Sequence, residues 1–245
     1  NTPMPHLAAL LPVAFPDLDT AGYLRVFPSL GVQTLQLHRN PDARDFQPAD
    51  ARNAANAAGL RFDSIHGRFG PDLDPSSPDP DLRALQDWVR EGGRMVVVHP
   101  STWTPSDPTP PAARLDALRL SAGQLAGLGH ALGITFLLEN LPPDYPVADP
   151  ATVAAVVREI ASPTLRMCFD FGHAHMRGPI ADALAHCSDV IAYAHVHDND
   201  TTADAHLLPG EGTIPWPTPP PPPPPHHPPP PRGGGGWGGA PRRGA

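Results

Sequence analysis

The 245-residue sequence contains no lysine, because all 17 basic residues are arginine. The absence of lysine excludes Schiff-base chemistry and a pyridoxal phosphate anchored on a lysine amine. It also excludes the Walker-type phosphate loop, in which a lysine reaches the phosphates. The formal net charge of −8 opposes a broad attraction to polyanions, so we expect no nucleic-acid partner.

Cysteine is nearly absent as well, with only Cys168 and Cys187 in the chain. This excludes a disulfide scaffold and a cysteine-based zinc site, so any metal must be held by His, Asp and Glu. No apolar run reaches the roughly 18 residues that suggest a membrane-spanning helix. The first residues also lack the basic segment of a secretory signal. We therefore expect a cytoplasmic protein without a membrane partner.

The composition changes after Trp216, where a proline run is followed by a glycine-rich segment. This segment has no apolar periodicity and too little to bury to offset the entropy of ordering. We therefore predict a folded domain over residues 1–216 and a Pro/Gly-rich disordered tail over 217–245. Three interpretations of the tail stay open: a ligand for an SH3-type domain, a segment without specific function, and the product of a lost reading frame. We favour the last, because GC-rich DNA read out of frame gives Pro, Gly, Arg and Ala.

Strand-like and helix-like patterns alternate along residues 1–216. The apolar runs typical of strands are 7–15, 32–38, 60–66, 94–100, 134–140, 165–171 and 190–197. The helix-like stretches between them are about 20–30, 47–58, 79–92, 111–132, 149–161 and 179–187. Such alternation predicts an α/β fold with a parallel sheet buried on both faces. Seven units favour a (β/α)8 TIM barrel that lacks its final βα unit. A doubly wound sheet is the alternative, but the glycine fingerprint after its first strand is absent.

Histidines and carboxylates fall at the ends of five successive predicted strands. They are His66, His99, Glu139, Asp170 with His173, and His195 with His197. In a barrel the carboxyl ends of the strands converge on one mouth, so these side chains should meet. Imidazole and carboxylate without thiolate suit Zn, Mn, Co or Fe(II), whereas Mg prefers fewer imidazoles. The sequence therefore predicts a divalent-metal site, with Zn, Mn or Co as its metal.

Taken one at a time, these residues differ in how strongly they indicate a metal or substrate role. A buried carboxylate such as Glu139 is costly without a partner, so we predict a metal or substrate role for it. The step Asp170-x-x-His173 lets both side chains reach one ion. Alone, His66 or His99 fits a hydrogen-bonded loop histidine better than a ligand, and only the whole set favours a ligand role.

Three segments resemble the xylose-isomerase-like TIM barrels, which include sugar and sugar-phosphate isomerases and epimerases and the endonuclease-IV-type AP endonucleases. They are FLLEN (136–140), FDFGHAH (169–175) and HVHDNDTTADAHLLPGEGTIPW (195–216), within a resemblance that covers about residues 7–216. The epimerase branch implies metal ligands at Glu139, Asp170 and His195, with His197 as the alternative to His195. The endonuclease branch implies the wider set His66, His99, Glu139, Asp170, His173, His195, Asp204 and His206.

The resemblance implies a metal-dependent isomerase or epimerase of a sugar or sugar phosphate, with Glu139 as general base. Substrate contacts would come from His38, Arg68, Asn140 and His197. The rival interpretation is a zinc phosphodiesterase acting on abasic DNA, which the ligand count favours and the acidic segment 67–81 opposes. The third interpretation is a non-catalytic, truncated relative of these enzymes.

The sequence departs from the family at its C-terminal end. In both branches an eighth strand ends in a metal-binding Glu, whereas proline and glycine follow Trp216 here. We therefore expect an open sheet edge, which favours association into a homo-oligomer. We also expect the metal to lack one ligand, with Glu211 as the only acid nearby.

Overall fold

The structure is a computed structural model that describes residues 8–11, 24–38, 48–66, 86, 89–90, 92–100 and 108–217. The chain divides into two units, Asn1–Pro215 and Trp216–Ala245, and the fold described below belongs to the first. The predicted division into a barrel domain and a tail stays a prediction. Within the described part, no helix combines the length and the apolar character that crossing a membrane requires.

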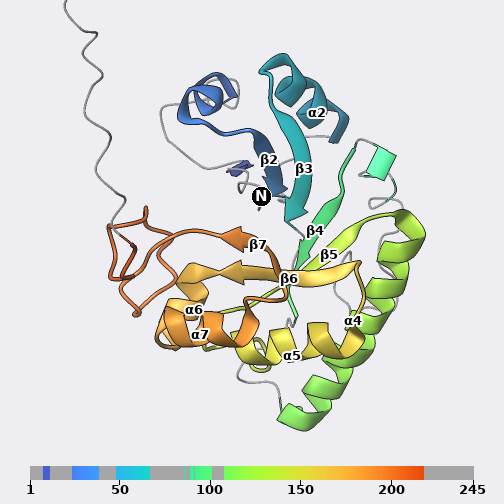
Figure 1. The fold of residues 1–245 in the computed structure, drawn as a ribbon, viewed down its shortest axis with the longest axis vertical. Coiled ribbons are helices and arrows are strands. Elements are labelled where there is room, and N and C mark those ends of the chain that lie inside the picture. The colour runs from blue at the N-terminus through green and yellow to red at the C-terminus, as the bar shows by residue number, and fades with distance from the viewer. Residues whose placement is uncertain are drawn as a thin grey trace, which may run out of the picture. The chain divides into compact units, whose positions relative to one another are not determined.

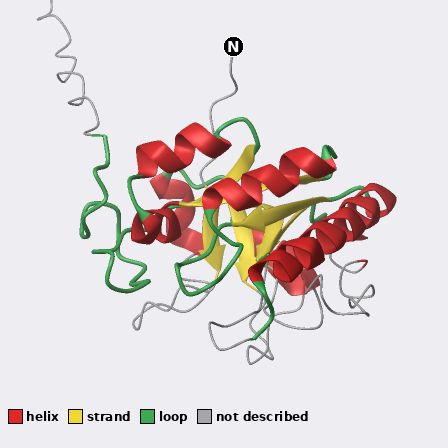
Figure 2. Ribbon diagram, turned by 90° about the horizontal axis from the view of Figure 1, so that it is seen from below, coloured by secondary structure: helices red, strands yellow, loops and turns green. Residues whose placement is uncertain are grey.

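Seven parallel strands form one sheet, and their order in the sheet is their order in the chain (Figure 1). They are β1 Ala8–Leu11, β2 Thr34–His38, β3 Arg61–His66, β4 Met95–Val98, β5 Thr135–Glu139, β6 Leu165–Asp170 and β7 Ile191–His195. The strands fan around a common centre, with helices on the outside (Figure 2). This sequential parallel order is that of a TIM barrel, so the predicted fold class is confirmed. Among the described residues no eighth strand follows β7.

The helices begin and end at recognisable signals. They are η1 Phe27–Leu30, α2 Pro48–Ala57, α4 Pro111–Leu132, α5 Pro150–Ile160, α6 Phe171–Arg177 and α7 Ile180–Cys187. The carboxylate of Asp149 accepts a hydrogen bond from the backbone N–H of Thr152 at 2.9 Å and so caps α5, with proline in its first turn. Gly133, at φ 69°, ends α4 in the left-handed conformation. Most of the helix predicted at 79–92 lies outside the described residues.

Helix α6 is a correction to the sequence prediction, which continued the strand to residue 171 and placed the next helix at 179–187. The strand ends at Asp170, whose backbone is extended and whose carboxylate accepts a hydrogen bond from the N–H of His173 at 2.7 Å. Asp170 is therefore the N-cap of α6. The cap explains the Asp-x-x-His spacing, since it brings His173 back toward the end of β6.

Alternate residues of the central strands face opposite sides of the sheet. On β5, Phe136 and Leu138 belong to the large core that the helices cover, whereas Leu137 belongs to a small inner hydrophobic cluster. The members of this inner hydrophobic cluster are Val97, Leu137 and Cys168, with Met95 and Tyr193 packed against them. Because side chains alternate with a period of two, Glu139 faces the same inner side as Leu137.

Candidate metal centre

Five predicted site residues stand at the carboxyl ends of β3 to β7, and all but the first come two positions after a residue of the inner hydrophobic cluster or one packed against it. We call them the strand group: His66, His99, Glu139, Asp170 and His195. Glu139 stands two residues after Leu137, and the same spacing relates Asp170 to Cys168. Because side chains on one face of a strand repeat every two residues, the polar layer lies directly above the apolar layer.

Glu139 lies at the centre of the strand group and is 1% exposed. Its Oε2 atom lies 3.3 Å from His66 Nε2 and 3.2 Å from His99 Nε2. Its Oε1 atom lies 2.8 Å from His195 Nδ1 and 3.6 Å from His173 Nδ1. A single carboxylate therefore faces four imidazoles, two on each oxygen.

Asp170 is the second buried carboxylate and is also 1% exposed. Its Oδ1 lies 3.0 Å from His197 Nε2, and its Oδ2 lies 3.7 Å from His195 Nδ1. His195 therefore faces both Glu139 and Asp170. The two candidates for the strand-seven ligand, His195 and His197, both reach Asp170.

Asn140 holds the backbone beneath these carboxylates. Its Nδ2 donates to the carbonyl of Asp170 and its Oδ1 accepts from the N–H of Asp170, both at 2.9 Å. The carbonyl oxygen of Asn140 in turn lies 2.8 Å from His173 Nδ1. Asn140 is fully buried and positions its neighbours, so its predicted contact with substrate stays a prediction.

A second set of ligand atoms lies beside the strand group, and we call it the loop group: His173, His197, Asp204 and His206. Asp204 Oδ2 lies 3.2 Å from His173 Nε2 and 3.2 Å from His206 Nε2. The rings of His197 and His206 stack with their centroids 4.1 Å apart. One ligand atom from each of the four lies within 4.8 Å of all the others.

Three overlapping sets of side chains in the described part could hold a metal ion. They are His66–Glu139–His195, Glu139–Asp170–His173, and the loop group. Glu139 occurs in two of these sets, and so does His173, which joins the strand group to the loop group. The predicted ligands therefore meet at one mouth, although their individual roles stay predictions.

Mutual electrostatics sets the protonation of this centre. Burial alone would raise the pKa of Glu139, but the imidazoles of His195, His66 and His99 hold it well below its usual value. Burial lowers the pKa of His173, yet the hydrogen bond to Asp204 and the nearby carboxylates outweigh burial and raise it to about 9. Without metal, the carboxylates are therefore ionised and His173 carries a proton at neutral pH. Below them, burial raises the pKa of Cys168 to about 11, which keeps it a neutral thiol.

The loop after β7 is organised by Asp198, which is fully buried. Its carboxylate accepts hydrogen bonds from the backbone N–H groups of Gly210 at 2.8 Å and Ile214 at 3.1 Å. A Cβ on Gly212 would lie 2.3 Å from Asp198 Oδ1, so only glycine fits there. The sequence analysis named no role for Asp198 itself, although the His195-x-x-Asp198 step is part of the segment that carries the family resemblance.

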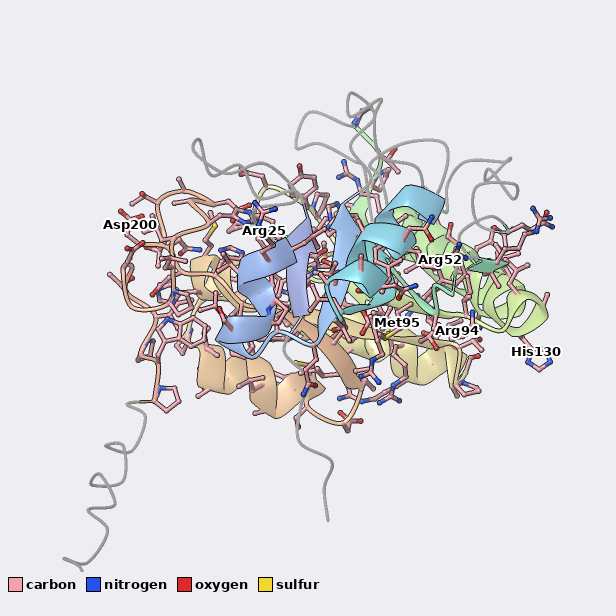
Figure 3. The ribbon with its side chains drawn as sticks, turned by 90° about the horizontal axis from the view of Figure 1, so that it is seen from above. Arg25, Arg52, Arg94, Met95, His130 and Asp200 are labelled. Atoms are coloured by element: carbon pink, nitrogen blue, oxygen red, sulfur yellow. The ribbon has the colours of Figure 1, made fainter. Side chains whose placement is uncertain are left out.

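Two local features support the loop group: the room that Gly172 leaves for His197, and the left-handed backbone of His206. A Cβ on Gly172 would lie 2.0 Å from the ring of His197, so the glycine of FDFGHAH makes room for that imidazole. His206 has φ 48°, a left-handed conformation that costs a non-glycine residue about 1–3 kcal/mol and concentrates at functional sites. At the tip of the same loop, Asp200 points outward (Figure 3).

Of three further residues named from the sequence, the structure describes the side chain of one, Glu211. Arg68 lies outside the described residues, and only the backbone of His38 is described, paired in register with His66. Glu211 accepts a hydrogen bond from the N–H of Leu208 at 3.2 Å and belongs to neither group. The structure adds a residue that the sequence analysis missed, Gln36 on β2.

The chain matches the family model described as xylose isomerase-like TIM barrel over residues 25–219. It belongs to this family. No curated protein matches the chain.

Solved structures with the same fold include sugar epimerases and an AP endonuclease. A D-tagatose 3-epimerase-like protein is 23% identical, with 75% of this chain and 74% of that chain covered and a TM-score of 0.61. The 3-keto-D-glucoside 4-epimerase of E. coli is 16% identical, with coverages of 85% and 82% and a TM-score of 0.65. An AP endonuclease, family 2, of Brucella melitensis is 16% identical, with both coverages 80% and a TM-score of 0.63. At these identities the likeness shows that this xylose isomerase-like chain shares their fold.

The donor atoms of this family member fit a metal ion. Glu139 Oε1 lies 2.8 Å and Asp170 Oδ2 lies 3.7 Å from the same nitrogen, His195 Nδ1. Ligand atoms on a tetrahedral ion with bonds of about 2.1 Å lie about 3.4 Å apart. These spacings lie on either side of that separation, so the donor set is compatible with an ion.

Proposed function

We propose that this chain is a divalent-metal-dependent isomerase or epimerase that acts on a sugar or sugar phosphate. The observation that carries the proposal is the buried carboxylate Glu139, surrounded by imidazoles at the mouth of a xylose isomerase-like barrel. The sugar epimerases with the same fold support a polyol substrate. The chemistry of the donors supports Zn, Mn or Co.

Glu139, Asp170 and His195 would hold the ion, which supplies Lewis-acid polarisation of a substrate carbonyl and its neighbouring hydroxyl. Oε1 of Glu139 faces His195 and would be the ligand atom. Oε2, buried without a hydrogen-bond partner among the described residues, is the atom we assign as base for the carbon-bound proton. His66 and His99 lie beside Oε2 and orient it.

One base favours isomerisation over epimerisation. A single carboxylate can take a proton from one carbon and return it to the next carbon on the same face of the substrate, while the proton of the neighbouring hydroxyl passes to the carbonyl oxygen. Epimerisation needs a second proton donor on the opposite face. The family resemblance places that donor on an eighth strand, and the described residues contain no eighth strand. Interconversion of an aldose and a ketose, which Glu139 alone could serve, is the first activity to assay.

Metal content tests the proposal directly. We expect about one Zn, Mn or Co per wild-type chain purified without chelators, measured by inductively coupled plasma mass spectrometry. Asp170→Ala should lose the metal and the isomerase activity, whereas Asp182→Ala, which removes an exposed acid of α7, should keep both. A folded wild-type chain without bound metal would contradict the proposal and favour the non-catalytic relative.

The loop group favours a second candidate, a zinc phosphodiesterase that acts on abasic DNA. In that enzyme Oε2 of Glu139 would be a ligand shared with His66 and His99, and the loop group would hold a further ion. Two or three zinc ions per chain, with cleavage of an abasic duplex and no sugar isomerisation, would replace the first proposal with this one.

A further inference from the structure

Gln36 is a buried polar residue of β2 that contacts the strand group and is 2% exposed. Its Oε1 atom lies 3.0 Å from His195 Nε2. The other ring nitrogen of His195, Nδ1, lies 2.8 Å from Glu139 Oε1 and 3.7 Å from Asp170 Oδ2. His195 is therefore held between an amide on one side and two carboxylates on the other.

This contact crosses the interior of the curled sheet. β2 and β7 are not neighbours in the strand order, and Gln36 and His195 are 159 residues apart in the chain. A buried amide is costly unless it is hydrogen-bonded, and an apolar side chain of similar length would fill the same space. The polar character of Gln36 therefore needs a reason, and His195 is the partner that the structure gives it.

The contact determines which ring nitrogen of His195 carries a hydrogen. When Gln36 Oε1 accepts, Nε2 of His195 carries the hydrogen. Nδ1 is then left toward Glu139 and Asp170, where an ion can replace its proton. Turning the amide would not satisfy it better, because Gln36 Nε2 has no partner among the described residues and Oε1 would take its place. When Nδ1 of His195 gives its lone pair to an ion, its hydrogen is on Nε2, and only the amide oxygen of Gln36 can accept it.

We propose that Gln36 is a positioning residue of the metal centre, which holds the ring of His195 so that Nδ1 is presented to the ion. Histidine ligands commonly donate their second ring N–H to an acceptor, and loss of such an acceptor typically lowers metal affinity about 10–100-fold. The inference rests on the proposed metal centre and is independent of which substrate the centre serves.

Two substitutions separate the effect of the hydrogen-bond acceptor of Gln36 from the effect of its side-chain volume. Gln36→Met keeps the length of the side chain and removes the acceptor, so the affinity for Zn²⁺, measured by competition with a chelator, should fall about 10–100-fold. Gln36→Glu keeps an acceptor and should bind within a few-fold of wild type. Gln33→Met, which changes an exposed glutamine before β2, is the matched control and should bind as wild type does.

The ring N–H of His195 gives a readout that packing alone would not move. In zinc-loaded protein with ¹⁵N-labelled histidine, the Nε2–H signal of His195, assigned by its loss in His195→Gln, should be present in wild type and Gln36→Glu. It should be lost or strongly shifted in Gln36→Met. If Gln36→Met does not fold, Gln36→Asn, whose amide is too short to reach, should show the same loss of affinity.

The outcomes distinguish this inference from the function. Wild-type affinity and an unchanged Nε2–H signal in a folded Gln36→Met or Gln36→Asn would overturn the role of Gln36 while the metal centre stands. A wild-type chain that binds no Zn²⁺, Mn²⁺ or Co²⁺ would overturn the metal centre and this inference with it.

Discussion

The strand group and the loop group offer the same donor chemistry on different supports. The two carboxylates of the strand group stand at strand ends and are 1% exposed. In the loop group the side chain of Asp204 is 32% exposed and that of His206 is 62% exposed. Donors on strands are fixed before an ion arrives, whereas the two exposed donors of the loop group, Asp204 and His206, must be ordered as it binds. We therefore expect the strand group to bind its ion more tightly.

Glu139→Gln should have the largest effect, because it removes the charge on which the strand group depends. Four imidazoles would lose their shared carboxylate, and an ion would lose its central ligand. We expect loss of metal from the strand group and a fall of about 10²–10⁴-fold in isomerase kcat, the range that a positioned acid–base group contributes. Glu159→Gln changes an exposed glutamate of α5 and is the control. Retained activity in Glu139→Gln would exclude Glu139 as the base.

Gly172→Ala should disturb the loop group while it leaves the strand group intact. The added methyl would lie 2.0 Å from the ring of His197, and such overpacking typically costs about 1–3 kcal/mol. Gly127→Ala is the control, because a Cβ at this position of α4 meets nothing within 4 Å. It should stabilise the protein by roughly 0.5–1 kcal/mol through its helix propensity. Urea unfolding of both variants measures the difference, and equal stability would contradict the close fit at His197.

The positions of the strand group were predictable because they depend on two regular features of the fold. Apolar runs locate the strands, and parallel strands of a barrel present their carboxyl ends at one mouth. Glu139 and Asp170 were thus identifiable as the first polar residues after buried runs. Both steps use only local sequence patterns and do not require knowledge of contacts between residues that are far apart in the chain.

Helix α6 and Gln36 could not be predicted in the same way. Helix α6 has seven residues, too few to show a helical period, and its cap is the residue that also ends β6. Gln36 lies within a strand whose inner face is decided by the curl of the sheet. Its partner His195 becomes visible only when that curl brings β2 and β7 together, which no local pattern encodes.

The pH dependence of stability should show how His173 joins the two groups. Its pKa is raised from 6.5 to about 9, so the metal-free protein has this stabilisation in full below pH 6.5 and loses it as the pH rises through 9. We expect the free energy of unfolding in chelator to fall by about 1–3 kcal/mol over that range. The apparent metal affinity should rise over the same range, because an ion then displaces fewer protons. Urea unfolding between pH 6 and 10 measures the first effect. His173→Gln should reduce the slope of the profile without abolishing it, because nearby groups outweigh burial and also raise the pKa of His195 well above its usual value. A pH-independent wild type would contradict the coupling.

Asp204→Asn with His206→Ala should have the smallest effect on sugar isomerisation, because it removes exposed donors of the loop group alone. The strand group should keep its ion, and kcat should change by less than about 10-fold, below the contribution of an acid–base group. Asp200→Asn, an exposed acid on the same loop (Figure 3), is the control and should match wild type. If the double variant instead loses all activity together with one of two ions per chain, the loop group is part of the reaction. The phosphodiesterase would then be the better account, because the isomerase mechanism needs only the strand group.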